Sequence, residues 1–134
     1  MTKNIKDLPR HQDDRGIIQM LMESCEVGSV SAISTEPNNG RASHYHKNDE
    51  HTIFVTNGQV DIYERPAGSD SRPVLTTLRA GDVHRTAKMV EHYMWMPEAT
   101  TFFCFSKLPR DSDSYEEDTV RFSHDLKIIF QDQV

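Results

Sequence analysis

The sequence contains few of the features that define secreted disulfide-linked domains, membrane proteins or nucleic-acid binders. Its two cysteines, Cys25 and Cys104, lie far apart in no metal-type spacing, so we expect two reduced thiols. No apolar run approaches the roughly 20 residues of a membrane helix, and the N-terminal residues form no apolar signal segment. The formal net charge of -6 argues against binding along nucleic-acid phosphates. We therefore expect a cytoplasmic protein that binds neither nucleic acid nor membrane.

Helix-forming runs are also scarce. β-branched and aromatic residues recur instead in short bursts, separated by Gly, Pro, Asn and Asp, which is typical of strands and turns. Turn signals about every ten residues predict roughly eight or more short strands in a sandwich or barrel. A chain of 134 residues is long enough for one domain and too short for two ordinary ones.

The turn residues set the predicted boundaries of the strands. Asn57-Gly58 is the strongest hairpin signal in the chain. After Pro109 the chain becomes acidic, which predicts a solvated linker up to Asp118. The pattern over residues 120–130 is compatible with either a strand or a short helix. The predicted strands cover residues 17–22, 27–34, a segment around residue 45, 51–56, 59–65, 74–78, 83–85, 91–96 and, as the central strand, 100–106.

Residues 44 to 51 concentrate the side chains that can carry chemistry. The two-residue spacing of His44 and His46 places both imidazoles on one face of a strand. On the following strand, His51 shares a face with the apolar Ile53, whereas Glu50 lies on the opposite face. Parity therefore favours His51 over Glu50 as the group that points inward.

A further histidine, His92, lies eleven residues after Gly81 and could meet these side chains inside a barrel. Neutral imidazoles suit several divalent transition metals, and their softness does not choose among Zn, Fe, Ni and Mn. An open position beside protein ligands would leave room for water or substrate. We predict one divalent metal ion, with the ligands His44, His46, His51 and His92, and Glu50 as the alternative to His51.

This spacing resembles the first motif of the cupin superfamily. That motif contains His-x-His, three or four residues, an acidic ligand, six residues and a glycine. His44-x-His46, four residues, His51, six residues and Gly58 fit the frame. A histidine stands where cupins usually have a glutamate. The motif also opens with a glycine, and here only three residues separate Gly40 from His44.

The second cupin motif is matched at Gly81 and His92, with Ala87 and Met89 in place of its proline and glycine. The resemblance covers residues 40–96. It implies an all-β fold, a small double-stranded β-helix or jelly-roll barrel, with the histidines pointing into its mouth. It also implies a homodimer. We expect a single cupin domain over residues 1–134, with a barrel core at about 15–107 and an acidic C-terminal extension at 108–134.

A broader likeness is to cupins that act on nucleotide-linked sugars. Asp14-Arg15-Gly16 before an apolar strand, Arg41, the run His44-Tyr45-His46-Lys47 and the acidic tail resemble 3,4-ketoisomerases and 3,5-epimerases of dTDP-4-keto-6-deoxyhexoses. They also resemble the cupin domain of capsular-polysaccharide reductases. The likeness implies His44 or His46 as the acid/base residue and Arg41 as a phosphate contact. Many members of this subgroup need no metal, whereas the additional His51 in this sequence is a candidate metal ligand.

These residues predict an isomerase or epimerase of a nucleotide-linked keto sugar. A neutral histidine can remove the proton next to the ketone, and a metal can stabilise the resulting oxyanion. The same histidines equally suit a mononuclear Fe or Ni dioxygenase. A non-catalytic cupin that binds a small molecule is the third possibility.

Overall fold

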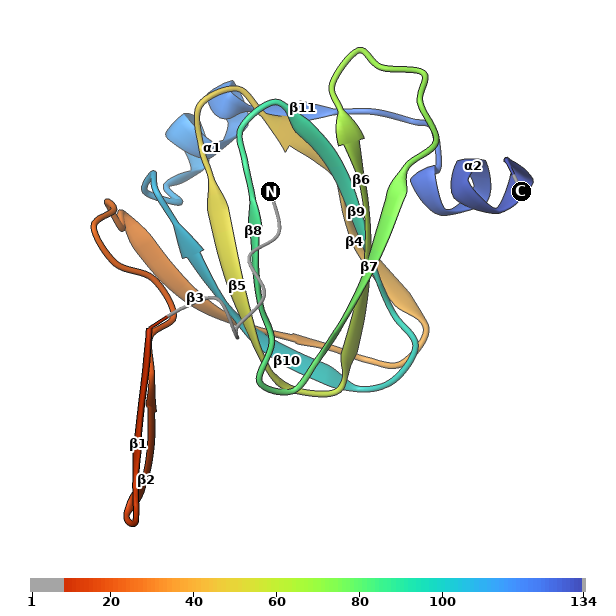
Figure 1. Cartoon of the computed structure of the whole chain (residues 1–134). Coiled ribbons are helices and arrows are strands. Elements are labelled where there is room, and N and C mark those ends of the chain that lie inside the picture. Colours follow the sequence, from red (N-terminus) through yellow and green to blue (C-terminus); the bar gives the residue numbers. More distant parts are fainter. Residues whose placement is uncertain (1–8, 134) are drawn as a thin grey trace.

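This computed structural model describes residues 9–133. They form eleven strands and two short helices, joined by loops and turns (Figure 1). The strands are β1 Arg10–Asp13, β2 Gly16–Gln19, β3 Ser29–Thr35, β4 Asn39–His46, β5 His51–Asn57, β6 Gln59–Pro66, β7 Val74–Arg79, β8 Val83–Thr86, β9 Val90–Met96, β10 Thr100–Ser106 and β11 Thr119–Arg121. The helices are α1 Ser112–Asp118 and α2 Leu126–Asp132. Within these described residues, no helix is long and apolar enough to cross a membrane.

Two antiparallel sheets face each other and enclose the interior (Figure 1). One has the strand order β3-β10-β5-β8, and the other has the order β11-β4-β9-β6-β7. Strand β10 lies between β3 and β5, as predicted for the central strand. The predicted all-β jelly-roll fold is therefore confirmed, whereas the predicted extent of a single domain stays a prediction.

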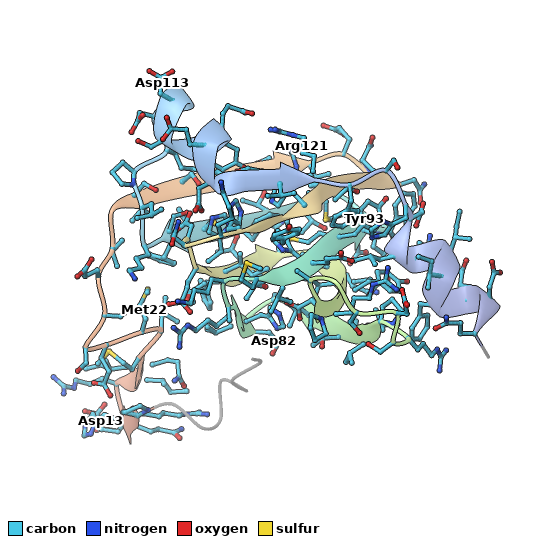
Figure 2. The ribbon with its side chains drawn as sticks, turned by 90° about the horizontal axis from the view of Figure 1, so that it is seen from above. Asp13, Met22, Asp82, Tyr93, Asp113 and Arg121 are labelled. Carbon is cyan, nitrogen blue, oxygen red and sulfur yellow. The ribbon has the colours of Figure 1, made fainter. Side chains whose placement is uncertain are left out.

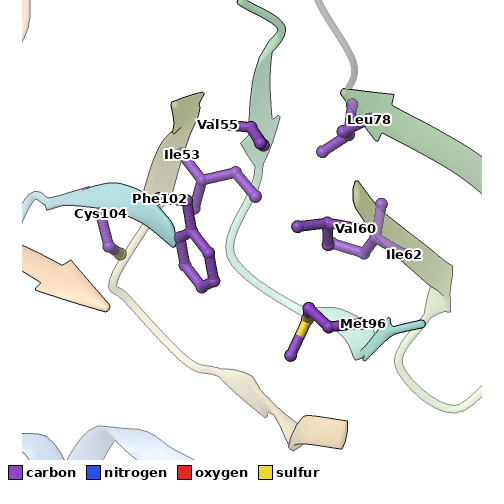
Figure 3. Packing of buried hydrophobic residues seen from close by; sticks show 8 residues of the cluster. All are labelled: Ile53, Val55, Val60, Ile62, Leu78, Met96, Phe102 and Cys104. Atoms are coloured by element: carbon purple, nitrogen blue, oxygen red, sulfur yellow. The ribbon is translucent and has the colours of Figure 1, made fainter. Parts of the chain in front are cut away.

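The apolar core fills one end of the space between the sheets (Figure 3). Its side chains alternate with outward-facing residues along each strand, as the period of two requires. Full burial of each larger apolar side chain contributes about 1.5–3 kcal/mol. The cluster consists of Ile53, Val55, Val60, Ile62, Leu78, Met96, Phe102 and Cys104.

The turn at Asn57-Gly58 joins strands of different sheets, so the predicted hairpin there is wrong. β5 pairs with β10 and β8, whereas β6 pairs with β7 and β9. Gly58 has φ +90°, and a Cβ atom on it would lie 2.4 Å from the Oγ1 atom of Thr100. The turn chemistry is therefore real, but the chain uses it to cross from one sheet to the other.

A two-stranded hairpin, β1–β2, projects away from the barrel (Figures 1 and 2). Asp13 lies near its tip, where its carboxylate accepts a 2.6 Å hydrogen bond from Arg15. The predicted first strand over 17–22 is shorter in the structure, and it pairs with residues 10–13, where no strand was predicted. Ile17 and Ile18 on this hairpin are 50% and 67% exposed.

The acidic segment after Pro109 is largely exposed, as predicted, but it is not a linker, because residues 112–118 form α1. Asp111 caps α1 by accepting a hydrogen bond from the backbone N–H of Ser114. The helix places Asp118, only 6% exposed, against the loop after β4, where it accepts N–H bonds from Asn48 and Asp49. β11 then adds to the edge of β4. Residues 120–130 thus contain the end of a strand and the start of α2, so each predicted alternative holds in part.

Candidate functional site

A cavity of about 230 Å³ lies between the two sheets, beside the apolar core. Apolar side chains of the core, including Ile53, Ile62 and Phe102, form part of its wall. The remaining wall is polar and contains three histidines, a thiol and two arginines. These polar lining residues are Arg41, His44, His51, Thr86, His92, Cys104, Arg110 and Tyr115.

The first wall of the cavity carries three of the predicted ligands on β4 and β9. His44 and His92 are direct partners in the register of these strands, and their ring centroids lie 4.7 Å apart. His46 follows on the same face of β4, 4.7 Å from the His44 ring. A β-bulge precedes His44, with positive φ values at Ala42 (79°) and Ser43 (68°). The bulge changes the strand's twist just before the histidines and so affects where His44 points.

These three histidines are neutral at pH 7. Burial, followed by repulsion from neighbouring histidines, lowers the pKa of His44 to about 2 and that of His46 to about 4. Burial likewise lowers the pKa of His92 to about 4. A neutral imidazole offers a lone pair, which both metal coordination and proton abstraction require.

The donor atoms of the first wall fit a metal ion. One nitrogen from each of His44, His46 and His92 lies within 4.8 Å of the others. Nε2 of His46 is buried and has no hydrogen-bond partner, which is costly unless a ligand satisfies it. Nδ1 of His92 lies 3.0 Å from the Val90 carbonyl oxygen, which fixes the ring and directs Nε2 elsewhere. Tetrahedral Zn–N bonds of about 2.0–2.1 Å would require the rings to approach slightly closer.

The second wall, formed by β5 and β10, holds His51 in a different environment. Its Nε2 atom lies 2.8 Å from Oδ2 of Asp49, which is 3% exposed. The other oxygen of Asp49 accepts backbone N–H bonds from Glu50 (2.9 Å) and Leu108 (3.0 Å). Burial acts to lower the pKa of His51, but hydrogen bonds with Asp49 and Cys104 outweigh it and raise the pKa to about 9. His51 is therefore an imidazolium at neutral pH.

The structure divides the predicted ligand set. It brings His44, His46 and His92 together as one possible metal group and His46, Asp49 and His51 as a second. The His51 ring lies 4.5 Å from the His46 ring and directs Nε2 to the Asp49 carboxylate. Glu50, the predicted alternative, points out of the cavity and binds Arg85 at 2.8 Å. The inward position of His51 and the outward position of Glu50 follow the predicted parity.

Arg41, the predicted phosphate contact, lies at the cavity. Its Nε atom donates to Oγ1 of Thr35 at 2.6 Å, and Nη2 donates to the carbonyl of Ser34 at 3.0 Å. A second arginine, Arg110, lines the same cavity and lies over the ring of Tyr115, with 4.9 Å between the guanidinium carbon and the ring centroid. These contacts hold two cationic side chains beside the histidines.

Several functional side chains were missed from the sequence. Asp49 lies two residues before His51, a spacing that could have suggested a pair, yet it falls in a predicted turn. Arg110, Tyr115 and Asp118 come from the segment predicted to be solvated. Cys104 was interpreted only as a buried thiol. Asp118 lies 3.5 Å from Nδ1 of His46, so the segment after the barrel helps to build the first wall.

No protein-family model matches the chain, and no characterised protein matches it in sequence. Solved structures do match its fold. A TDP-quinovose 3,4-ketoisomerase from Campylobacter jejuni is 20% identical, with a TM-score of 0.71 and coverage of 97% of both chains. A 3,4-ketoisomerase from Helicobacter canadensis is 15% identical, with a TM-score of 0.70 over 97% of this chain and 95% of that one.

A dTDP-4-dehydrorhamnose 3,5-epimerase from Sulfolobus tokodaii is 16% identical, with a TM-score of 0.69 over 87% of this chain and 74% of that one. These likenesses show that the chain has the cupin-type jelly-roll fold. The match to the two 3,4-ketoisomerases extends over nearly the whole of both chains.

Proposed function

We propose that the protein is an isomerase or epimerase of a nucleotide-linked keto sugar. The observation that carries this proposal is the pairing of opposite protonation states across one cavity: neutral His44 on one wall and the His51 imidazolium on the other. Enolisation of a ketone needs a proton acceptor and a stabiliser of the developing oxyanion, and this cavity offers both. The likeness in fold to ketoisomerases supports the same class of substrate.

His44 is the proposed base, because it lines the cavity whereas His46 lies behind it. It takes the proton next to the ketone, and the carbonyl oxygen becomes an enediolate oxygen. The His51 imidazolium stabilises that oxygen by charge and hydrogen bonding. The low pKa of His44 in the empty cavity rises beside this anion, because an opposite charge favours the protonated imidazole. The proton of the neighbouring hydroxyl passes to the former carbonyl oxygen, and return of the abstracted proton to the former carbonyl carbon completes isomerisation.

Arg41 and Arg110 are the proposed contacts for the diphosphate. A guanidinium binds phosphate oxygens through two parallel, charge-assisted hydrogen bonds. The cavity of about 230 Å³ is smaller than the roughly 300 Å³ at which pockets for drug-sized ligands begin. It therefore takes the sugar ring, while the nucleotide lies outside, beside the two arginines.

As an alternative to His44 acting as a free base, we propose a divalent transition metal on the first wall, held by His44, His46 and His92; with the ion bound, the lone pair of His44 would be used for coordination and would not serve as the base. The unpartnered Nε2 atom of His46 and the low pKa values of all three support this site. His51 is outside the proposed set because Asp49 occupies its Nε2 atom. A bound ion would act as a Lewis acid on the substrate oxygen.

The same three neutral histidines favour the second candidate, a mononuclear Fe or Ni dioxygenase. Elemental analysis of the purified protein distinguishes the two candidates, together with oxygen uptake in the presence of diols or diketones. Redox-inert Zn without oxygen uptake supports the isomerase. Bound Fe with oxygen uptake would replace the isomerase by the oxygenase.

The direct test of the isomerase uses TDP-4-keto-6-deoxyglucose in deuterated water, followed by nuclear magnetic resonance. We expect deuterium at the carbon next to the ketone and a rearranged keto sugar. His44→Gln should lower the rate by about 10²–10⁴-fold, the usual contribution of a general base. His11→Gln, at an exposed histidine of the β1–β2 hairpin, is the matched control and should keep full activity. Binding of TDP without exchange or turnover would indicate a non-catalytic binding protein.

We also propose a cytoplasmic homodimer that binds neither nucleic acid nor membrane. An isolated two-stranded hairpin is marginal in water, so the projecting β1–β2 hairpin with its exposed Ile17 and Ile18 is suited to packing on a second copy. Light scattering after size-exclusion chromatography tests this. Ile18→Lys should yield monomers, whereas Val74→Lys, at a site 64% exposed on β7, should leave the dimer intact.

A further inference from the structure

Three polar side chains, Glu64, His84 and Thr86, meet in the interior and take no part in the function proposed so far. His84 and Thr86 alternate with the outward-facing Arg85 on β8, so both point between the sheets. Glu64 comes from β6, in the opposite sheet. Its Oε1 atom lies 2.8 Å from Nε2 of His84, and its Oε2 atom accepts a 2.7 Å hydrogen bond from the Thr86 hydroxyl.

This contact fixes the direction in which the Thr86 hydroxyl can bond. A hydroxyl has one hydrogen to donate and two lone pairs that accept. The hydrogen of Thr86 is directed to Glu64, and His84, only 1% exposed, holds the other oxygen of that carboxyl group. Thr86 itself lines the cavity. Its oxygen can therefore only accept a hydrogen bond from a molecule in the cavity.

The strand register places Thr86 next to His51. The two residues are direct partners of the antiparallel strands β8 and β5, and both line the cavity. Side chains of direct partners share one face of the sheet, with Cβ atoms about 4.5–5.5 Å apart. In the proposed function, His51 binds the ketone oxygen of the sugar. Thr86 is therefore placed to reach the oxygen on the adjacent carbon.

We propose that Thr86, oriented by Glu64 and His84, determines specificity by accepting a hydrogen bond from the sugar hydroxyl next to the ketone. This inference rests on the proposed function, because it takes the ketone oxygen to lie at His51. An α-hydroxy ketone offers an acceptor to His51 and a donor to Thr86. A sugar without that hydroxyl leaves the buried Thr86 oxygen unpaired, which weakens binding.

The test measures binding rather than turnover. We determine dissociation constants by calorimetry for TDP-4-keto-6-deoxyglucose and for its 3-deoxy analogue, which lacks the hydroxyl next to the ketone. The protein is the His44→Gln variant, because it should isomerise the first sugar too slowly to disturb the titration. We expect the hydroxylated sugar to bind about tenfold more tightly than the analogue. Equal affinities would overturn the proposal.

Variants of Thr86 on this background identify the group that is responsible. Thr86→Val removes the hydroxyl with little change in shape, and should weaken binding of the hydroxylated sugar alone by about tenfold. Thr86→Ser keeps the hydroxyl and should keep the preference. Thr77→Val is the matched control, because Thr77 also donates to a carboxylate, that of Asp61 at 3.0 Å, but lies on β7 outside the cavity.

A purely structural role of Thr86 predicts a different result for the valine variant. Thr86→Val would then weaken both sugars alike and leave the preference for the hydroxyl unchanged, which would overturn the proposal. If Thr86→Val does not fold, the comparison of the two sugars in the protein that retains Thr86 still exposes the proposal to failure, since equal affinities there contradict it.

Turnover of TDP-4-keto-6-deoxyglucose by the wild-type protein separates this inference from the proposed function. Turnover without a preference for the hydroxyl would overturn the role of Thr86 and leave the isomerase standing. A preference that depends on Thr86, without turnover, would uphold that role and count against the isomerase. Failure to bind either sugar would overturn both.

Discussion

The two walls of the cavity contain the same type of side chain at the same degree of burial, with opposite charge states. His44 and His51 are both 8% exposed. The pKa of His44 falls to about 2, whereas that of His51 rises to about 9. The difference comes from the partners of each ring, because repulsion from neighbouring histidines adds to the effect of burial at His44, whereas interactions with Asp49 and Cys104 outweigh burial at His51. The groups next to each histidine, rather than its burial, therefore decide whether its imidazole is neutral or protonated at pH 7.

The largest expected effect is loss of stability in acid. The first-wall histidines have folded-state pKa values below the unfolded value of 6.5, so their stabilising contribution is present above pH 6.5 and is lost as pH falls toward 4. Each contributes about 1.4 kcal/mol per pH unit, so the three together contribute about 4 kcal/mol per unit. Urea unfolding at pH 7, 6 and 5 measures this slope.

His51 acts in the opposite direction. Its raised pKa contributes stability that is fully present below pH 6.5 and is lost as pH rises toward 9. It therefore adds no slope on the acid side. His44→Gln should flatten the acid slope by about a third, whereas His11→Gln should leave it unchanged. A free energy of unfolding that is constant between pH 7 and 5 would show that the first-wall histidines are not held neutral.

The second effect tests the carboxylate of the second wall. Asp49→Asn should lower the free energy of unfolding by about 3–5 kcal/mol, because it leaves the His51 charge buried without its partner. Asp13→Asn is the matched control, since its pair with Arg15 lies at the exposed tip of the hairpin and should show no measurable change. If both variants unfolded at similar urea concentrations, the buried Asp49–His51 pair would stabilise the protein no more than the exposed Asp13–Arg15 pair.

The third effect concerns the proposed metal site on the first wall. Zn²⁺ at about 100 times its dissociation constant should stabilise the protein by about 2.7 kcal/mol, measured as a rise in Tm. His92→Gln should abolish that rise because it removes one of three ligands. His124→Gln, a histidine outside the cavity that binds Glu91, should retain it. A rise in Tm that survives His92→Gln would place the ion elsewhere.

The smallest effect belongs to Glu50, which lies next to His51 in sequence and outside the cavity. Glu50→Gln removes a partly exposed ion pair with Arg85, so we expect a loss of about 0–1 kcal/mol. Metal content, measured by elemental analysis, should stay unchanged. Reduced metal content in this variant would add Glu50 to the proposed ligand set.

Local geometry was predictable from the sequence, because strand periodicity depends only on neighbouring residues. His44 and His46 share a face, and His51 points inward while Glu50 points outward, as parity requires. The pairing of strands was not predictable in this way. β4 and β5 follow one another in the sequence but lie in opposite sheets, so His51 faces the other histidines across the interior.

Asp49, Arg110 and Tyr115 were missed as site residues because their positions also depend on contacts between distant parts of the chain. The loop that carries Asp49 is held by hydrogen bonds to Asp118, 70 residues further along the chain from Asn48, and by the Leu108 N–H bond to Asp49 itself. Arg110 and Tyr115 were interpreted as part of a solvated segment because polar composition favours exposure. A single sequence does not reveal such long-range hydrogen bonds.

The contact of Asp118 with the loop after β4 also has a consequence for the order in which the molecule assembles. During synthesis, β4 and β5 leave the ribosome long before the acidic helix that secures the loop between them. Contacts with such large separation along the chain form late, after the cost of closing the loop has been met. The barrel, β10 included, can therefore collapse around its apolar core first, and the loop that carries Asp49 reaches its final position only when the segment after β10 docks.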